Sequence, residues 1–421
     1  MKINLKIFHN RNVLFYWMAV WASALGDAIL ILAISWFIVE TTDSGVILGT
    51  FMMCMGMARI IFMVIGGVYV DRFPPLMIMK ISLLIRAGIL SYLMYVMVSE
   101  MEFAIGLYIG AIVFGMVDAF FLPAAAAIRQ RLVSSEHFSQ LNSLLLVATQ
   151  TSVMVGPLLG SFLIRKGDYL MTVGAVIALF LIAMVMLQAV ILHQSLDMKK
   201  ENLKRSNHSK GAFFNELVEG FRYIVNTPII LTMMIVAMLV NAGVSVLTVA
   251  LPFLAQHFGS GAEGLSMMNA AMGFGGAIGA VVFTLWTIKM PTPQMNLTAS
   301  FIEGSALFFI ALTPNLWGVG LLLGVIGFTT TAINVIAPSV NQSIIPKPLM
   351  GRVVSVMMVV MTGLTPFAQS FAGYLTEKMS THHGLMYGGA LELFASGLAF
   401  FIPAVRNYSA HYVKKRINQR G

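Results

Sequence analysis

The sequence predicts an all-α membrane protein with twelve transmembrane helices, arranged as two pseudo-symmetric bundles of six. Of its 421 residues, 58% are hydrophobic and 10% are charged, whereas a soluble protein has about 25% charged residues. The mean hydropathy is +0.86. So few charges cannot cover a surface that faces water, and apolar stretches of about 20 residues match the thickness of a bilayer core. We therefore expect most of the chain to lie in lipid.

Apolar stretches separated by short polar segments define the expected helices. The first is longer than the roughly 7–15 apolar residues of a signal peptide, so we expect it to remain in the protein. The first six helices are expected near 13–39, 45–70, 75–98, 103–127, 140–164 and 169–193. The second six are expected near 228–255, 264–288, 293–313, 316–337, 352–375 and 384–404.

The charged residues between these stretches predict the orientation of the chain. Bases gather on one side: Lys2, Lys6, Arg11, Arg72, Arg129, Arg131, Lys289, Lys347, Arg352 and the C-terminal VKKRINQR. The opposite loops are mainly acidic, with Glu40, Asp43, Glu100, Glu102, Asp168, Glu263 and Glu377. Because basic loops stay in the cytoplasm, we expect both termini there and the protein in the cell (plasma) membrane. The net charge of +9 then reflects topology rather than a nucleic-acid partner.

One long polar segment, His193 to Lys210, divides the chain. After it, FFNELVEGFRYIVN (213–226) has apolar residues at helical spacing. The sequence predicts a six-helix bundle at 1–194, a cytoplasmic linker with an amphipathic helix at 195–227, and a second bundle with a basic tail at 228–421. The amphipathic helix either lies on the inner membrane surface or is part of a solvated linker without a specific role.

The two halves of the chain resemble each other. MVGPLLGSFL in the fifth expected helix corresponds to GLTPFAQSFAG in the eleventh. GGVYVDRFPPLMIMK after the second helix corresponds to GAVVFTLWTIKMPTPQM after the eighth. Both pairs have an offset of about 210 residues, half of the chain. This repeat indicates a duplicated six-helix unit, which is an arrangement found in transporters.

Two loop and helix motifs point to a known family. Gly67, Asp71 and Arg72 form a Gly-x-x-x-Asp-Arg loop after the second helix, and VGPLLG contains Gly156, Pro157 and Gly160. With the six-plus-six pattern, the first motif resembles the loop signature of the major facilitator superfamily, although Pro74, Pro75 and Leu76 replace its usual Gly and bases. The second resembles the Gly-Pro motif of the superfamily's exporters.

Three further segments are similar to the macrolide-efflux branch of the drug:proton antiporters within that superfamily. They are ALGDAILILAISWFI (24–38), FGMVDAFFLPA (114–124) and MGRVVSV (350–356). This resemblance implies the major facilitator fold and proton-coupled efflux of small molecules by alternating access.

The charged pair Asp71–Arg72 is interpreted as part of a conformational latch with Gly67 and Arg352. Pro74 and Pro75 cannot continue a helix but can begin one, so the second helix should end there and the third should start. The internal repeat places the inner end of the eleventh helix near Arg352. A contact of Asp71 there would join the two halves on the cytoplasmic side. The alternative is that the pair only anchors a loop at the lipid headgroups.

Six ionisable residues inside the expected helices are candidate functional residues, because charges in a bilayer are costly. Asp27 either carries a proton or binds Arg59 or Arg86, and Asp118 is either a second proton site or a partner of Arg72 or Arg86. Arg86 is either a structural counter-ion or a substrate ligand, and Arg59 is near enough to its helix end to snorkel.

Glu303 and Glu392 lie in the ninth and twelfth helices, which in the resembled fold usually support the cavity from outside. Both remain candidates for proton coupling, with a structural role as the alternative. Neutral polar residues are candidates for lining a cavity or for contacts between helices: Ser23 beside Asp27, Asn241, Ser245 and Thr248 in the seventh helix, and Thr330, Asn334 and Asn341 in the tenth.

The leading functional hypothesis is a monomeric secondary transporter that exports amphipathic small molecules or antibiotics in exchange for protons. The alternative is an exporter of a dedicated lipid, siderophore or peptide metabolite. A polytopic membrane enzyme is disfavoured because the sequence has no Glu-x-x-His motif and no phosphate-binding P-loop. No cofactor and no metal site are expected.

Overall fold

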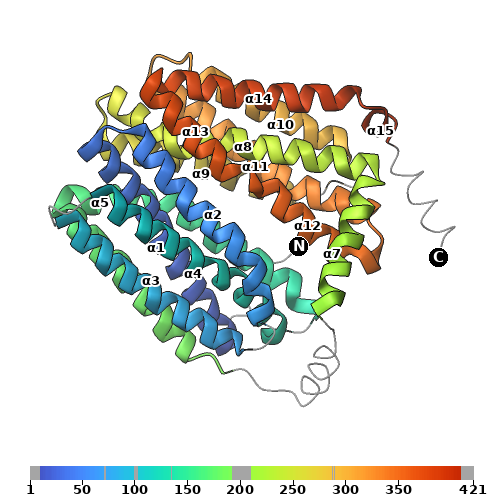
Figure 1. The fold of residues 1–421 in the computed structure, drawn as a ribbon, viewed down its shortest axis with the longest axis horizontal. Helices are drawn as coiled ribbons and strands as arrows, with labels where there is room; N and C mark the ends of the chain where they lie inside the picture. Colours follow the sequence, from blue (N-terminus) through green and yellow to red (C-terminus); the bar gives the residue numbers. More distant parts are fainter. Residues whose placement is uncertain are drawn as a thin grey trace. The chain divides into compact units, whose positions relative to one another are not determined.

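The computed structural model describes residues 10–70, 73–98, 103–133, 135–191, 210–286, 288 and 290–408. All regular elements in these ranges are helices (Figure 1). The chain forms two compact units. Unit 1 comprises Met1–Met198 and Leu251–Ala270, and unit 2 comprises Lys199–Ala250 and Ala271–Gly421.

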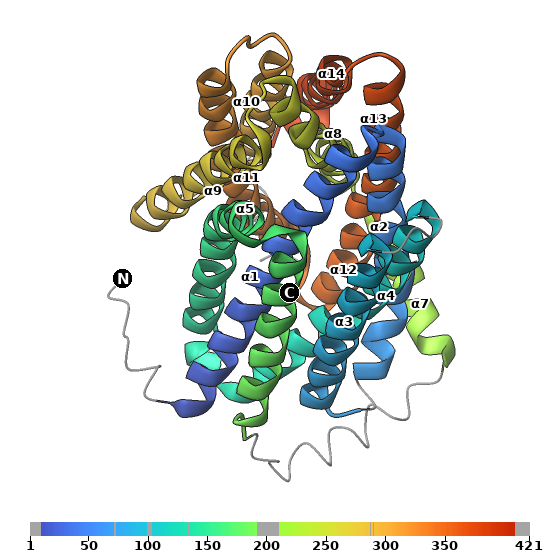
Figure 2. The ribbon, with the colours of Figure 1, turned by 90° about the vertical axis from the view of Figure 1, so that its left-hand side faces the viewer.

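Unit 1 contains five long helices: α1 (Arg11–Thr42), α2 (Gly45–Val70), α3 (Pro75–Val98), α4 (Phe103–Leu132) and α5 (Ser135–Gln188). α1 packs along α5, and α3 packs against α4 and α5 (Figure 2). α5 changes direction at Gly167 and Asp168, which have φ angles of −150° and 71°. α2 ends at Val70 and α3 begins at Pro75, which confirms the predicted stop and start around the two prolines.

Unit 2 is built from the rest of the chain. Its elements are α7 (Lys210–Val225), α8 (Pro228–His257), α9 (Gly261–Leu285), α10 (Pro293–Ile310), α11 (Leu316–Ile344), a 3-10 turn (Lys347–Leu349), α12 (Met350–Gly363), α13 (Thr365–Lys378), α14 (Thr381–Phe401) and α15 (Pro403–Arg406). α10 packs against both α11 and α14. The end of α8 and the start of α9 belong to unit 1, where Ser161 donates a hydrogen bond to Ser266 (3.0 Å).

The helices account for twelve membrane crossings in the described ranges. Ten segments are long and apolar enough to span a bilayer when α5 is counted once and α12 is joined with α13. The bend in α5 makes two crossings of that helix. α10 adds the twelfth, because its 18 residues extend over ~27 Å at 1.5 Å per residue. The predicted all-α, twelve-helix architecture is confirmed.

Gly115 lies where α4 crosses α2 closely. A Cβ atom at this position would be 2.1 Å from the carbonyl oxygen of Met55. Gly115→Ala should therefore push the two helices apart, and overpacking of this kind costs about 1–3 kcal/mol. We expect a lower unfolding temperature for the purified protein in detergent.

The matched control is Gly88→Ala in α3, where a Cβ would meet nothing within 4 Å. This variant should be neutral or slightly more stable, because alanine is the better helix former. Equal unfolding temperatures for the two variants would show that the close approach at Gly115 does not contribute to stability.

Candidate functional site

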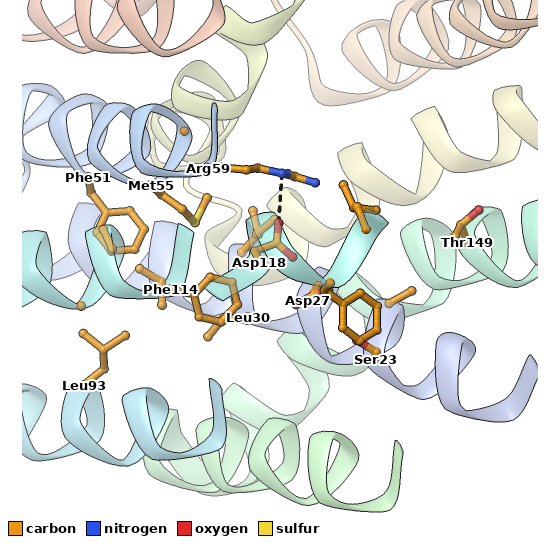
Figure 3. Close-up of a pocket in the computed structure, with 18 of the residues that line it drawn as sticks. Ser23, Asp27, Leu30, Phe51, Met55, Arg59, Leu93, Phe114, Asp118 and Thr149 are labelled. Atoms are coloured by element: carbon orange, nitrogen blue, oxygen red, sulfur yellow. Dashed lines mark ion pairs between the residues drawn. The ribbon is translucent and has the colours of Figure 1, made fainter. Parts of the chain in front are cut away.

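A cavity of about 330 Å³ opens inside unit 1 between α1, α2, α3, α4 and α5 (Figure 3). Five of its nineteen lining residues are polar: Ser23, Asp27, Arg59, Asp118 and Thr149. The others are apolar or glycine, with aromatic side chains from Phe51, Phe114 and Phe121. A concave, mostly apolar space with a few polar groups is the usual form of a small-molecule site.

Arg86 links the two aspartates of this cavity. Its side chain is fully buried on α3. One terminal nitrogen, Nη1, donates to both carboxylate oxygens of Asp27 at 3.2 and 3.3 Å. The other, Nη2, donates to Asp118 of α4. Arg86 therefore holds α1, α3 and α4 together through charge-assisted hydrogen bonds, the stronger class of such bonds.

Three aromatic rings surround the guanidinium group of Arg86. Its Cζ atom lies 4.8 Å from the ring centre of Phe121, 5.3 Å from that of Phe114 and 5.8 Å from that of Phe180. A ring face attracts a cation, and the attraction grows when water is excluded. These rings keep the positive charge of Arg86 in place without giving it another hydrogen-bond acceptor. Its buried Nε has no hydrogen-bond partner among the described residues.

The two aspartates differ in their partners and exposure. Asp118 also forms an ion pair with Arg59, whose Nε lies 3.0 Å away, and is 15% exposed. Asp27 is 34% exposed and is paired with Arg86 at the longer distances given above. Figure 3 shows Asp27 and Asp118 facing the same space, with Arg59 reaching Asp118 from α2. Asp27 is therefore the acid that is less tightly held.

The formal charges of this cluster cancel when both aspartates are ionised, because Arg59 and Arg86 balance Asp27 and Asp118. A proton on Asp27 would leave a net charge of +1 beside the cavity. The protonation of one carboxyl would thus change the net charge that a cationic ligand meets from zero to a repulsive +1, in surroundings where screening by water is weak.

The exporter-like motif helps to position Asp27. A Cβ at Gly156 of α5 would be 2.6 Å from the Ala28 side chain, and one at Gly160 would be 3.2 Å from that of Leu32. These small residues allow α5 to approach α1 immediately after Asp27. Pro157 lies between them, inside the helix.

The other predicted cavity residues occupy varied positions. Ser23 lines the cavity and is buried. In unit 2, the exposed Asn241 donates to the Ala237 carbonyl, and the buried Ser245 donates to the Ala242 carbonyl, both within α8. Asn334 is exposed on α11. The role of these three residues in lining a cavity stays a prediction.

The predicted latch is only partly within the described residues. Asp71 and Arg72 lie outside them, and Gly67 is described only as part of the α2 backbone. Arg352, at the start of α12, forms an ion pair with Glu219 of α7 inside unit 2. The proposed contact between Asp71 and the region of Arg352 therefore stays a prediction.

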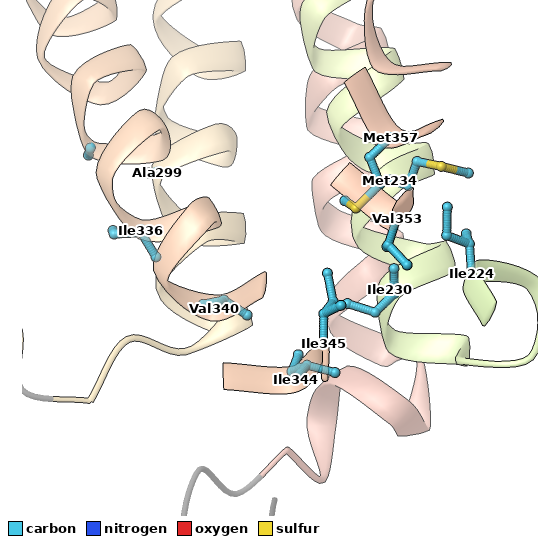
Figure 4. Close-up of a cluster of buried hydrophobic side chains, with 11 residues drawn as sticks. Ile224, Ile230, Met234, Ala299, Ile336, Val340, Ile344, Ile345, Val353 and Met357 are labelled. Carbon is cyan, nitrogen blue, oxygen red and sulfur yellow. The ribbon is translucent and has the colours of Figure 1, made fainter. Parts of the chain in front are cut away.

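α7 covers the segment for which an amphipathic helix is expected, and it packs against other helices of unit 2. Ile224 joins a buried cluster with Ile230, Val353 and Met357 (Figure 4). Tyr223 donates to the Ile344 carbonyl at 3.2 Å. Burial raises the pKa of the Tyr223 hydroxyl, which keeps it neutral and able to donate. α7 is thus docked on the bundle by an apolar face.

The structure adds residues that the sequence reasoning did not single out. Phe114, Phe121 and Phe180 are not among the candidate residues named from the sequence, yet all three surround Arg86. A signal was available for two of them, because Phe114 and Phe121 are four residues before and three after Asp118, and such residues share a helix face. No local pattern relates Phe180 to Arg86.

A buried charge cluster beside an apolar cavity, within a twelve-helix membrane protein, is the architecture of a membrane transporter. The sequence profile of the Major Facilitator Superfamily matches residues 16–368. The chain belongs to this superfamily of transporters.

Among relatives, the chain is 24% identical to the uncharacterized MFS-type transporter YkuC of Bacillus subtilis (strain 168), over 98% of this chain and 96% of that protein. It is 23% identical to the multidrug efflux pump Tap of Mycolicibacterium fortuitum, over 92% and 95% of the two chains.

Solved structures with the same fold include a mutant of the nucleoside transporter NupG, with a TM-score of 0.72, 11% identity, and coverage of 92% of this chain and 99% of that one. The D-xylose-proton symporter has a TM-score of 0.69, 12% identity, and coverage of 96% and 99%. At these identities the likeness shows the fold alone.

Proposed function

We propose that the protein exports amphipathic, positively charged small molecules in exchange for protons, by alternating access in the cell membrane with both termini in the cytoplasm. The observation that carries this proposal is the Asp27 carboxylate. It is 34% exposed in an otherwise mostly apolar cavity and is paired with the buried Arg86.

The cavity supports this substrate class in two ways. Its apolar and aromatic lining suits the apolar body of an amphipathic molecule. Asp27 suits its positive charge, because an ionised carboxylate attracts a cation strongly where water is excluded. A cationic substrate and a proton would then compete for the same carboxylate, and this competition is a simple way to exchange one for the other.

The names of two relatives agree with export. Tap is named a multidrug efflux pump, and a further relative, 25% identical over 69% of this chain, is named a putative bacilysin exporter, BacE, of Bacillus subtilis (strain 168). The second name also fits the alternative, an exporter of one dedicated metabolite. An experiment should therefore compare both kinds of substrate.

Transport into inside-out membrane vesicles tests the proposal. With an acidic lumen, we expect uptake of a cationic amphipathic dye, loss of that uptake when a protonophore removes the pH gradient, and weak uptake of a neutral analogue of the same shape. Vesicles without the protein are the control. Uptake that is the same with and without the pH gradient would refute proton coupling. Saturable uptake of only a lipid, siderophore or peptide from the same panel would instead support the dedicated exporter.

A further inference from the structure

A second pair of acids lies in unit 2, apart from the cavity residues of unit 1. Glu303 of α10 is 1% exposed, and Glu392 of α14 is fully buried. Glu303 accepts a hydrogen bond from Thr330 of α11. Neither carboxyl oxygen of Glu392 has a hydrogen-bond partner among the described residues. The two acids lie on neighbouring helices, because α10 packs against α14.

Glycines allow two helices, α8 and α10, to pack closely against the Glu392 side chain of α14. A Cβ at Gly243 of α8 would be 2.6 Å from Glu392 Oε1. A Cβ at Gly304 of α10, next to Glu303, would be 2.6 Å from the Glu392 Cβ. The Glu392 side chain therefore occupies space that side chains on α8 and α10 would otherwise fill, with its carboxyl group against α8 and its Cβ against α10. Such close packing keeps the unpartnered group away from the aqueous surface.

No basic side chain in the described ranges forms an ion pair with either acid. α10 has no other ionisable residue, and α11 has none. The remaining ionisable groups on helices packed here are His257, Tyr374, Glu377, Lys378, His382, His383, Tyr387 and Arg406. The nearest of them along α14 is Tyr387, which is 52% exposed. His382 is ten residues from Glu392 within α14, which corresponds to about 15 Å along the helix, and Arg406 lies beyond the end of α14, in α15.

An ionised carboxylate in these surroundings is very costly. Moving a lone charge into a medium of low dielectric costs tens of kcal/mol by simple solvation arguments, so such a group normally takes up a proton instead. Two neighbouring buried carboxyls cannot both ionise for the further reason that like charges repel. A hard metal cation would need about six oxygen ligands. The described side chains provide the four carboxyl oxygens and the hydroxyl of Thr330, so a proton fits the site better.

We propose that Glu303 and Glu392 form a proton-binding site in unit 2, in which at least one of the two carboxyls, on the packed helices α10 and α14, carries a proton. This site is separate from Asp27 and does not depend on the role of Asp27 in transport. It would give the protein a second buried proton-binding site. The acids of this site are buried by the packing of three helices, whereas Asp27 is paired with an arginine.

Infrared spectra of the purified full-length protein in detergent test this site. All measurements use an Asp27→Asn background, so that failure of the Asp27 hypothesis cannot affect the result. Asp118 keeps its ion pairs with Arg59 and Arg86 in this background. We expect a neutral carboxylic-acid band at neutral pH that disappears in alkaline buffer. Glu303→Gln combined with Glu392→Gln should remove the band, and an alkaline pH jump should release about one proton less per chain.

Single variants and controls separate the alternatives. In either single variant the remaining carboxyl loses its charged neighbour, so its band should disappear at a lower pH than in the parent protein. Glu377→Gln, the same change at an exposed position of α13, should leave the band and the proton count unchanged.

The proposal would be overturned by a band that survives in the double variant, by single variants that titrate like the parent, or by a parent protein without the band. Sodium ions that displace the proton, compared with choline, would show a cation site instead. Glutamine has nearly the same shape as neutral glutamate, so all variants should elute as folded protein in size-exclusion chromatography.

Discussion

Arg86→Leu should destabilise the protein by about 3–5 kcal/mol, which is the usual cost of removing one partner from a buried ion pair. Arg86 is fully buried and binds both Asp27 and Asp118. Its loss would leave Asp27 without this ion pair and Asp118 with Arg59 alone. Unfolding in detergent, monitored by intrinsic fluorescence against temperature or denaturant, measures the effect.

Two comparisons make this test specific. Arg165→Leu removes an exposed arginine, 64% accessible, from its ion pair with Glu263, and exposed pairs contribute about 0–1 kcal/mol. Adding Asp27→Asn to Arg86→Leu should recover part of the stability, because it removes the charge that has lost its ion pair, whereas Asp118 keeps Arg59. If Arg86→Leu and Arg165→Leu lose the same stability, the buried cluster does not hold α1, α3 and α4 together.

Asp27→Asn should abolish uphill, proton-driven transport while the protein still folds and reaches the membrane. Asparagine resembles the protonated carboxyl, so position 27 would carry no negative charge at any pH. A contact between opposite charges with a hydrogen bond contributes about 1.5–3 kcal/mol. At 1.4 kcal/mol for each tenfold change, a cationic ligand should bind roughly 10- to 150-fold more weakly.

The affinity for a cationic ligand should change with pH in a definite direction. In the parent protein, binding of a cationic dye should strengthen as pH rises, because Asp27 loses its proton and gains a negative charge. In Asp27→Asn the same binding should be weak and nearly independent of pH. Equilibrium dye binding to purified protein, followed by fluorescence polarisation across a pH series, measures both.

Asp27→Glu is the control, because it keeps an ionisable group at the cavity. It should retain part of the transport activity, with a shifted pH optimum. A neutral analogue of the dye should bind the parent and Asp27→Asn about equally. Unchanged pH dependence in Asp27→Asn would remove Asp27 from coupling and leave Asp118, Glu303 or Glu392 as the proton carrier.

The sequence determined the architecture because hydropathy and loop charge are local properties of the chain. Long apolar stretches predicted the helices, and Pro74 and Pro75 marked the boundary between α2 and α3. Together with the six-plus-six pattern of helices, the Asp-Arg loop indicated the superfamily whose profile matches residues 16–368. These features can be recognised without knowing which helix faces which.

The tertiary structure decided which charges meet. Hydropathy indicates that Asp27, Arg86 and Asp118 are costly in a membrane, but the same pattern allows several pairings among them. The pairing depends on helix contacts that small residues permit, such as Gly156 against Ala28 in unit 1. In unit 2, Gly243 and Gly304 bring α8 and α10 against Glu392. Contacts of this kind join residues far apart in the chain, and no local pattern encodes them. Only the packed helices therefore show which acids share Arg86, and which acids of the described ranges form no ion pair with a basic side chain.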